Sequence, residues 1–133
     1  MHRILITVLA AAFACTLAQA QFAPQHYAPS EVNGLIDRVH TDLNQAYEGG
    51  WHFTSGDRHR LDEAEHQLRE FAKKWDHGKF DKGQLDDSIS KVQKVLDNNH
   101  MPPGSRDAID SDLAQLRAMR EAYEHHEIGY SHP

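Results

Sequence analysis

Glutamate and histidine lie one helical turn apart near the end of the chain, where they could bind a divalent metal ion. Glu121 and His125 are four residues apart, and His126 follows directly. Imidazole nitrogen and carboxylate oxygen are both ligands that Zn²⁺ and related ions accept. A histidine at the end of a helix also interacts favourably with the helix dipole, which explains the same residues without a metal. The sequence therefore offers Glu121, His125 and His126 as metal candidates but does not require a metal, and it indicates no other cofactor.

A second pattern, Glu63-x-x-His66, has the spacing with which four-helix bundles build centres of two metal ions. Asp37-x-x-His40 is a looser copy. At about 100° per residue, however, His66 falls roughly opposite the apolar stripe that contains Leu68. Ligands of a shared metal must point inward, so we expect no buried di-metal centre.

Two large aromatic side chains, Trp51 and Phe53, lie in the first connection between predicted helices. They could close the end of the bundle above its core, or they could form an exposed patch that binds a partner protein. The sequence leaves both interpretations open. A haem-attachment motif, a glycine-rich phosphate loop and a Gly-x-Ser-x-Gly elbow are absent, and no acid and base couple stands out. We therefore predict that the protein is not an enzyme.

These candidate residues must be positioned by four segments that repeat apolar residues at helical spacing. The four sets are Val32, Leu35, Ile36, Val39, Leu43, Ala46 and Tyr47; Leu61, Ala64, Leu68, Phe71, Ala72 and Trp75; Leu85, Ile89, Val92 and Leu96; and Ile109, Leu113, Leu116, Met119 and Tyr123. Short connections favour antiparallel neighbours. The pattern predicts an all-α, up-down-up-down four-helix bundle.

Polar residues at the segment boundaries predict where helices begin. Asp81 followed by Gln84 suggests a capping box, and Phe80 and Leu85 are placed to form a hydrophobic staple across it. The hydroxyl residues expected to cap the other three helices are Ser30, Thr54 or Ser55, and Ser105.

The first twenty residues have the pattern of a cleaved secretory signal peptide. Arg3 precedes an uncharged apolar run, 4–17, which ends at Ala18-Gln19-Ala20, and this run is too short to cross a bilayer well. Cleavage would leave a chain that begins at Gln21. The alternative is a lipoprotein with lipid on Cys15, although the residues before this cysteine do not match the usual lipidation pattern.

The chain therefore divides into a signal peptide at 1–20, a flexible lead at 21–29, one helical domain at 30–127 and a tail at 128–133. Cys15 is the only cysteine, so the mature protein would contain no disulfide and no thiolate metal site.

Charge narrows the possible partners. The chain has 14 basic and 20 acidic residues and a net charge of −6 with histidine neutral. Removal of Arg3 with the signal gives −7, and protonation of the ten remaining histidines would bring the charge to +3. An acidic protein is a poor fit for nucleic acid or for an anionic membrane surface. We expect an exported soluble protein, periplasmic or secreted, that serves as a protein-interaction or envelope-stress module. The alternative is a divalent-metal-binding protein that uses surface histidines.

We expect the signal peptide at 1–20 to be removed in the host. Intact-mass analysis of the protein recovered from its host should give a chain that begins at Gln21. A chain that begins at a lipid-modified Cys15 would establish the lipoprotein alternative, and an uncleaved chain would contradict both.

Overall fold

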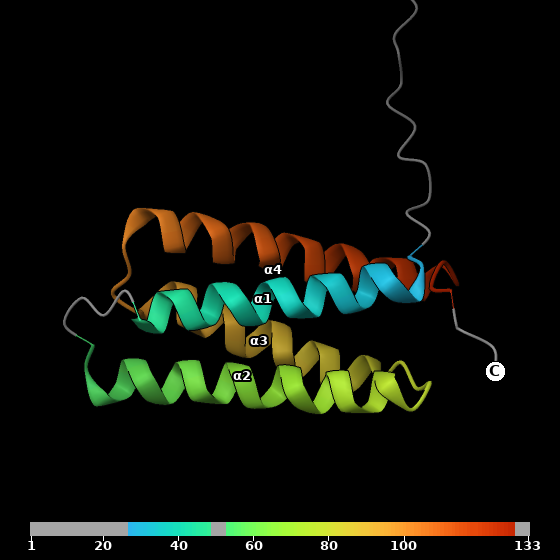
Figure 1. The fold of residues 1–133 in the computed structure, drawn as a ribbon, viewed down its shortest axis with the longest axis horizontal. Helices are drawn as coiled ribbons and strands as arrows, with labels where there is room; N and C mark the ends of the chain where they lie inside the picture. Colours follow the sequence, from blue (N-terminus) through green and yellow to red (C-terminus); the bar gives the residue numbers. More distant parts are fainter. Residues whose placement is uncertain (1–26, 49–52, 130–133) are drawn as a thin grey trace, which may run out of the picture.

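The computed structural model describes residues 27–48 and 53–129, which form four α-helices. α1 spans Pro29–Glu48, α2 spans Ser55–Asp76, α3 spans Lys82–Asn98 and α4 spans Pro103–Glu124. Successive helices run in opposite directions (Figure 1). The predicted all-helical four-helix arrangement is confirmed, and the described ranges contain no strand beyond one isolated bridge. The expected signal peptide lies outside the described residues.

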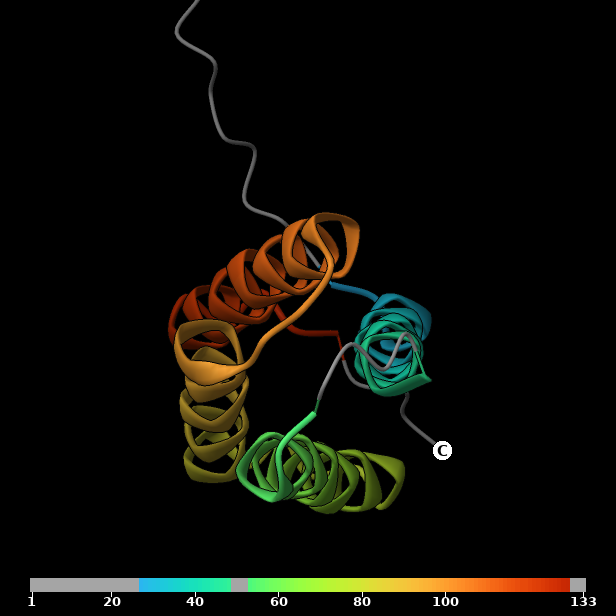
Figure 2. The ribbon, with the colours of Figure 1, turned by 90° about the vertical axis from the view of Figure 1, so that its left-hand side faces the viewer.

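The four helices surround one core, and each packs against the two that are its neighbours around the ring (Figure 2). The contact between α2 and α3 is the most extensive, and the contact between α1 and α2 is the least. None of the described helices is both long and apolar enough to cross a membrane. The helix α1 is thus held by α4 and, over a smaller interface, by α2.

The core consists largely of the apolar residues that helical spacing predicted. Most of these side chains are buried, and Tyr47, which is 44% exposed, is the main exception. The structure adds Val95 and Ala122 to the core. Four polar residues are also buried among the described ranges: Asp57, Ser88, Asn99 and Asp112. Two of them, Asp57 and Asp112, carry carboxyl groups whose surroundings differ sharply.

Aromatic rings close the end of the core at the connection between α2 and α3. Phe80, which is 5% exposed, stacks on Tyr123 with ring centroids 4.4 Å apart and planes at 9°. It also meets Phe71 and Trp75 edge to face, at 5.2 Å and 6.0 Å. Such pairs add about 0.5–1.5 kcal/mol to the free energy gained from burial. The side chain predicted to staple the start of α3 therefore also joins α2 to α4.

Local hydrogen bonds explain where α2 and α3 begin. Thr54 caps α2 through a reciprocal capping box with Asp57, as one of the two expected hydroxyl residues. Asp81 caps α3 and accepts a hydrogen bond from the Gln84 backbone N at 3.0 Å. The Gln84 side chain contacts Gln67 on α2 instead of turning back to Asp81. Half of the predicted capping box is therefore present.

The two predicted caps at Ser30 and Ser105 are wrong. The helix α1 begins at Pro29, one residue before Ser30, and α4 begins at Pro103, two residues before Ser105. Proline has a fixed φ that suits the first helical turn and lacks the N–H that this turn leaves unpaired. The prolines therefore start both helices earlier than the hydroxyl residues would.

The two ends of the described chain pair beside the start of α1. Tyr27 N donates to Glu127 O at 3.0 Å, and Gly129 N donates to Tyr27 O at 2.7 Å. Ile128, opposite Tyr27 in this isolated parallel bridge, is buried in the core. Residues 27–29 of the expected lead and 128–129 of the expected tail thus lie within the fold, because their backbone groups bond to one another.

Removal of the ring that joins α2 to α4 should destabilise the bundle. We expect Phe80→Ala to lower the free energy of unfolding by about 3–5 kcal/mol, the usual cost of deleting a buried ring, as measured by urea denaturation. Tyr47→Ala is the matched control because this side chain is 44% exposed and lies outside the core, and it should cost less than about 1 kcal/mol. Equal losses in the two variants would contradict the role given to Phe80.

Candidate functional site

The metal candidates Glu121, His125 and His126 are exposed at the C-terminal end of α4. His125 is the C-cap, and its backbone N donates to Glu121 O at 3.2 Å. His126 adopts a left-handed backbone with φ of 58°, which turns the chain toward Ile128. Among the described residues, no three His, Cys, Asp or Glu side chains are grouped so that they could hold a metal ion. The metal hypothesis at this end stays a prediction.

The Glu63-x-x-His66 pair is not directed into the core. Glu63 Oε2 lies 3.0 Å from Lys91 Nζ of α3, and Glu63 Oε1 lies 3.6 Å from His59 Nε2. His66 is exposed. The outward placement expected from the helical stripe explains why these residues do not meet a second ligand set.

Of the two partner candidates, Trp51 lies outside the described residues, whereas Phe53 packs against the core in a partly buried position. Phe53 also stacks on Tyr47, with ring centroids 6.2 Å apart and planes at 20°. A surface hollow of about 450 Å³ borders Phe53, and Ser55, Arg58, His59 and Asp62 complete its lining. The exposed ring of Tyr47 on α1 is thus stacked on the ring of Phe53, which precedes α2.

Another hollow, of about 290 Å³, lies at the C-terminal end of α2 between lysine side chains. Lys73, Lys74, His77 and Lys79 line it together with Glu70. Lys74 Nζ is bound to Asp81 at 2.7 Å. Cationic side chains complement the negative end of a helix dipole, so this surface has a structural explanation.

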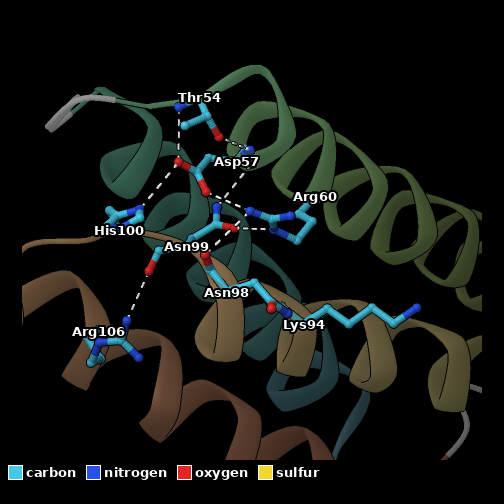
Figure 3. Close-up of polar contacts among 8 residues, drawn as sticks. All are labelled: Thr54, Asp57, Arg60, Lys94, Asn98, Asn99, His100 and Arg106. Atoms are coloured by element: carbon cyan, nitrogen blue, oxygen red, sulfur yellow. Dashed lines mark hydrogen bonds and ion pairs between the residues drawn. The ribbon is translucent and has the colours of Figure 1, made fainter.

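A polar network around Asp57 joins the opposite end of α2 to the connection between α3 and α4 (Figure 3). Asp57 Oδ2 accepts from Thr54 N at 3.0 Å, and Asp57 Oδ1 accepts from Arg60 Nη2 at 2.7 Å. Arg60 Nε donates to Asn99 Oδ1 at 2.6 Å, and Asn99 Nδ2 donates to Asp57 O at 3.0 Å. His100 approaches Asp57 Oδ2 only at 3.8 Å, from an exposed position. Both carboxylate oxygens therefore have hydrogen-bond donors.

Arg106 extends the network into α4. Its guanidinium donates to Leu96 O at 2.6 Å and to Asn99 O at 3.0 Å. These two carbonyls lie at the C-terminal end of α3, where a helix leaves carbonyl groups without an internal partner. The network thus fixes three helix ends relative to one another, and its role is structural.

The electrostatics of Asp57 fit this role. Burial by itself would raise the pKa of Asp57, but hydrogen bonds from Thr54 and Arg60 and the charge of Arg60 outweigh burial and hold the pKa below its ordinary value. The group therefore stays ionised at neutral pH. Asp57 was not singled out from the sequence. Its position three residues after Thr54 is the sequence signal for its capping role, whereas its bonds to the end of α3 depend on the tertiary fold.

Loss of the Asp57 charge should weaken this end of the bundle. Asp57→Asn keeps the shape but turns amide hydrogens toward existing donors, so we expect it to cost about 3 kcal/mol at pH 7, measured by urea denaturation. Because the folded pKa of Asp57 is lowered, its stabilisation is present above about pH 4 and is lost as the pH falls further. The cost of the substitution should shrink accordingly in acid. Asp110→Asn, which alters an exposed acid, is the control and should change stability little at either pH.

Known proteins give no indication of the function, so the proposal below rests on the sequence and the structure of this chain. No protein-family model matches the chain, and no curated protein or solved structure shows significant similarity to it.

Proposed function

We propose that the mature protein is exported to the periplasm or secreted, and that it acts by binding another protein rather than by catalysis. The observation that carries the proposal is the exposed ring of Tyr47 stacked on Phe53 at the edge of a surface hollow. A role in envelope stress is compatible with such a module. Export itself rests on the signal-like sequence at 1–20.

The composition of this surface supports protein binding. Tyrosine and arginine are enriched at the energetic centres of protein interfaces, where apolar contact combines with a polar tip. Tyr47 and Phe53 supply apolar area, while Arg58 and Asp62 line the same hollow as Phe53 with opposite charges. A partner segment with an apolar side chain flanked by polar groups would match this arrangement.

The non-enzymatic part of the proposal has separate support. Buried Asp57 bonds to Arg60, and Arg106 bonds to the end of α3, so these charged groups are committed to holding the fold. The sequence also lacks the catalytic motifs noted above. These observations favour a binding role without identifying the partner.

A photo-crosslinking amino acid at position 47 tests the proposal in the natural host. The full-length protein with the crosslinker at position 47 should form one discrete adduct after irradiation, because this position faces the partner. The matched control places the same crosslinker at Asp87, an exposed position on α3. Equal adducts at both positions, or none at position 47, would contradict the proposed surface.

A partner identified in this way allows a quantitative measurement. Tyr47→Ser should weaken its binding at least about tenfold in calorimetry, as loss of a central interface aromatic does. The melting temperature of the variant should stay close to that of the wild type, since the ring is exposed. Unchanged affinity would rule out Tyr47 as a contact.

A further inference from the structure

Polar contacts hold α1 against both of its neighbours, in addition to its apolar stripe. Toward α2, His40 Nδ1 contacts Glu65 Oε2. Toward α4, Arg38 Nε lies 3.4 Å from Asp112 Oδ1, and the carboxyl group of Asp42 lies near enough to act on Asp112. Because α1 has its smallest interface with α2, these contacts bear on whether α1 stays docked.

The surroundings of Asp112 favour a proton on this acid or on Asp42. Two ionised carboxylates can only accept hydrogen bonds, so they can bond to each other only when one of them is protonated. The Asp112 side chain is only 2% exposed, and its Oδ2 is buried without a hydrogen-bond partner in the described part of the chain. Arg38 offsets the negative charge from a largely exposed position. Without the proton, two like charges would face each other between α1 and α4.

The contact with His40 also leaves part of the Glu65 carboxylate without a hydrogen-bond partner. The Glu65 side chain is 13% exposed, and its Oε1 is buried without a partner among the described residues. Asp62 and Arg69 act on it from its own helix with opposite charges. A proton held between His40 and Glu65 either neutralises the carboxylate or turns the pair into an ion pair. Loss of that proton leaves a largely buried carboxylate with one oxygen unpartnered among the described residues.

The helix α3, which packs against both α2 and α4, directs its charged groups to other residues. Lys91 lies 3.0 Å from Glu63, and Asp86 contacts Arg120. The described charged groups that act on the two buried acids therefore come from α1 and, for Glu65, also from α2.

The pKa values of the two acids are shifted in the direction that this geometry requires. Burial raises the pKa of Asp112 to about 7, with the hydrogen bond and charge of Asp42 adding to the effect and Arg38 opposing it. Burial likewise raises the pKa of Glu65 to about 7. In an unfolded chain both groups titrate near pH 4. The folded state therefore binds these protons more tightly, so the resulting stabilisation is complete below about pH 4 and is lost as the pH rises through about 7.

We propose that α1 is a proton-controlled latch, docked on α2 and α4 while the His40–Glu65 and Asp42–Asp112 contacts each hold a proton, and released locally when they lose it. Release is confined to α1 because α3 holds α2 and α4 through separate contacts. The latch does not depend on the protein-binding function proposed above.

Amide hydrogen exchange of the full mature chain tests the latch directly. Protection of α1 and α3 peptides is compared at pH 5, 6.5 and 8, after correction for the intrinsic pH dependence of exchange. Each group that holds an extra proton in the docked state can change the opening equilibrium by up to about tenfold per pH unit between its two pKa values. We expect α1 to lose at least tenfold in protection from pH 5 to pH 8, while α3 changes less. Parallel changes in α1 and α3 would overturn the proposal.

Variants that imitate the protonated acids give the second arm of the experiment. Glu65→Gln combined with Asp112→Asn should keep α1 protected at pH 8 and flatten its pH profile. Glu63→Gln is the matched control because Glu63 lies on the same helix and pairs with Lys91 outside the latch; it should keep the wild-type profile. A double variant that retains the wild-type pH dependence of α1 would also overturn the latch. If the double variant does not fold, the comparison of α1 with α3 in the wild type decides the question alone.

Discussion

The buried carboxylate of Asp57 constrains one whole end of the bundle. An ionised group can leave water only where donors replace the lost hydration, and Asp57 receives them from Thr54 and Arg60. Arg60 also binds Asn99, whose carbonyl accepts from Arg106. The start of α2, the end of α3 and the start of α4 must therefore meet at one place. The chain has a single cysteine and can form no internal disulfide, so the Asp57 network and the apolar core hold these elements together.

Asp112 is as deeply buried as Asp57 but has the opposite electrostatics. Donors surround Asp57 and lower its pKa, whereas Asp112 meets another acid and one exposed arginine, and its pKa is raised. One buried acid thus stabilises the fold when ionised, and the other does so when neutral. The Asp57 network stabilises the fold from mildly acidic pH to higher pH, whereas the docking of α1 is strongest at acidic pH. Sensitivity to pH is therefore localised to one helix rather than spread over the bundle.

The fold could be predicted from the sequence because apolar spacing is a property of each helix alone. Asp112 was not singled out from the sequence, although it lies in the apolar stripe of the last segment, three residues after Ile109 and four before Leu116. An acid at such a position signals an unusual site. Its partner could not be predicted, because the contact with Asp42 depends on how α1 is rotated against α4. The stacking of Tyr47 on Phe53 depends in the same way on how α1 meets the chain that leads into α2.

The latch and the proposed binding surface share α1. Tyr47 lies in the last turn of this helix, and Phe53 precedes α2, so release of α1 would separate the two rings. A partner that binds the stacked pair must, by linkage, favour the docked helix and raise its proton affinity. Protonation of the histidines acts in the same direction, because it moves a net charge of −6 toward zero and relieves self-repulsion. If both proposals hold, mild acid assembles the surface that the partner recognises, and alkaline conditions dismantle it.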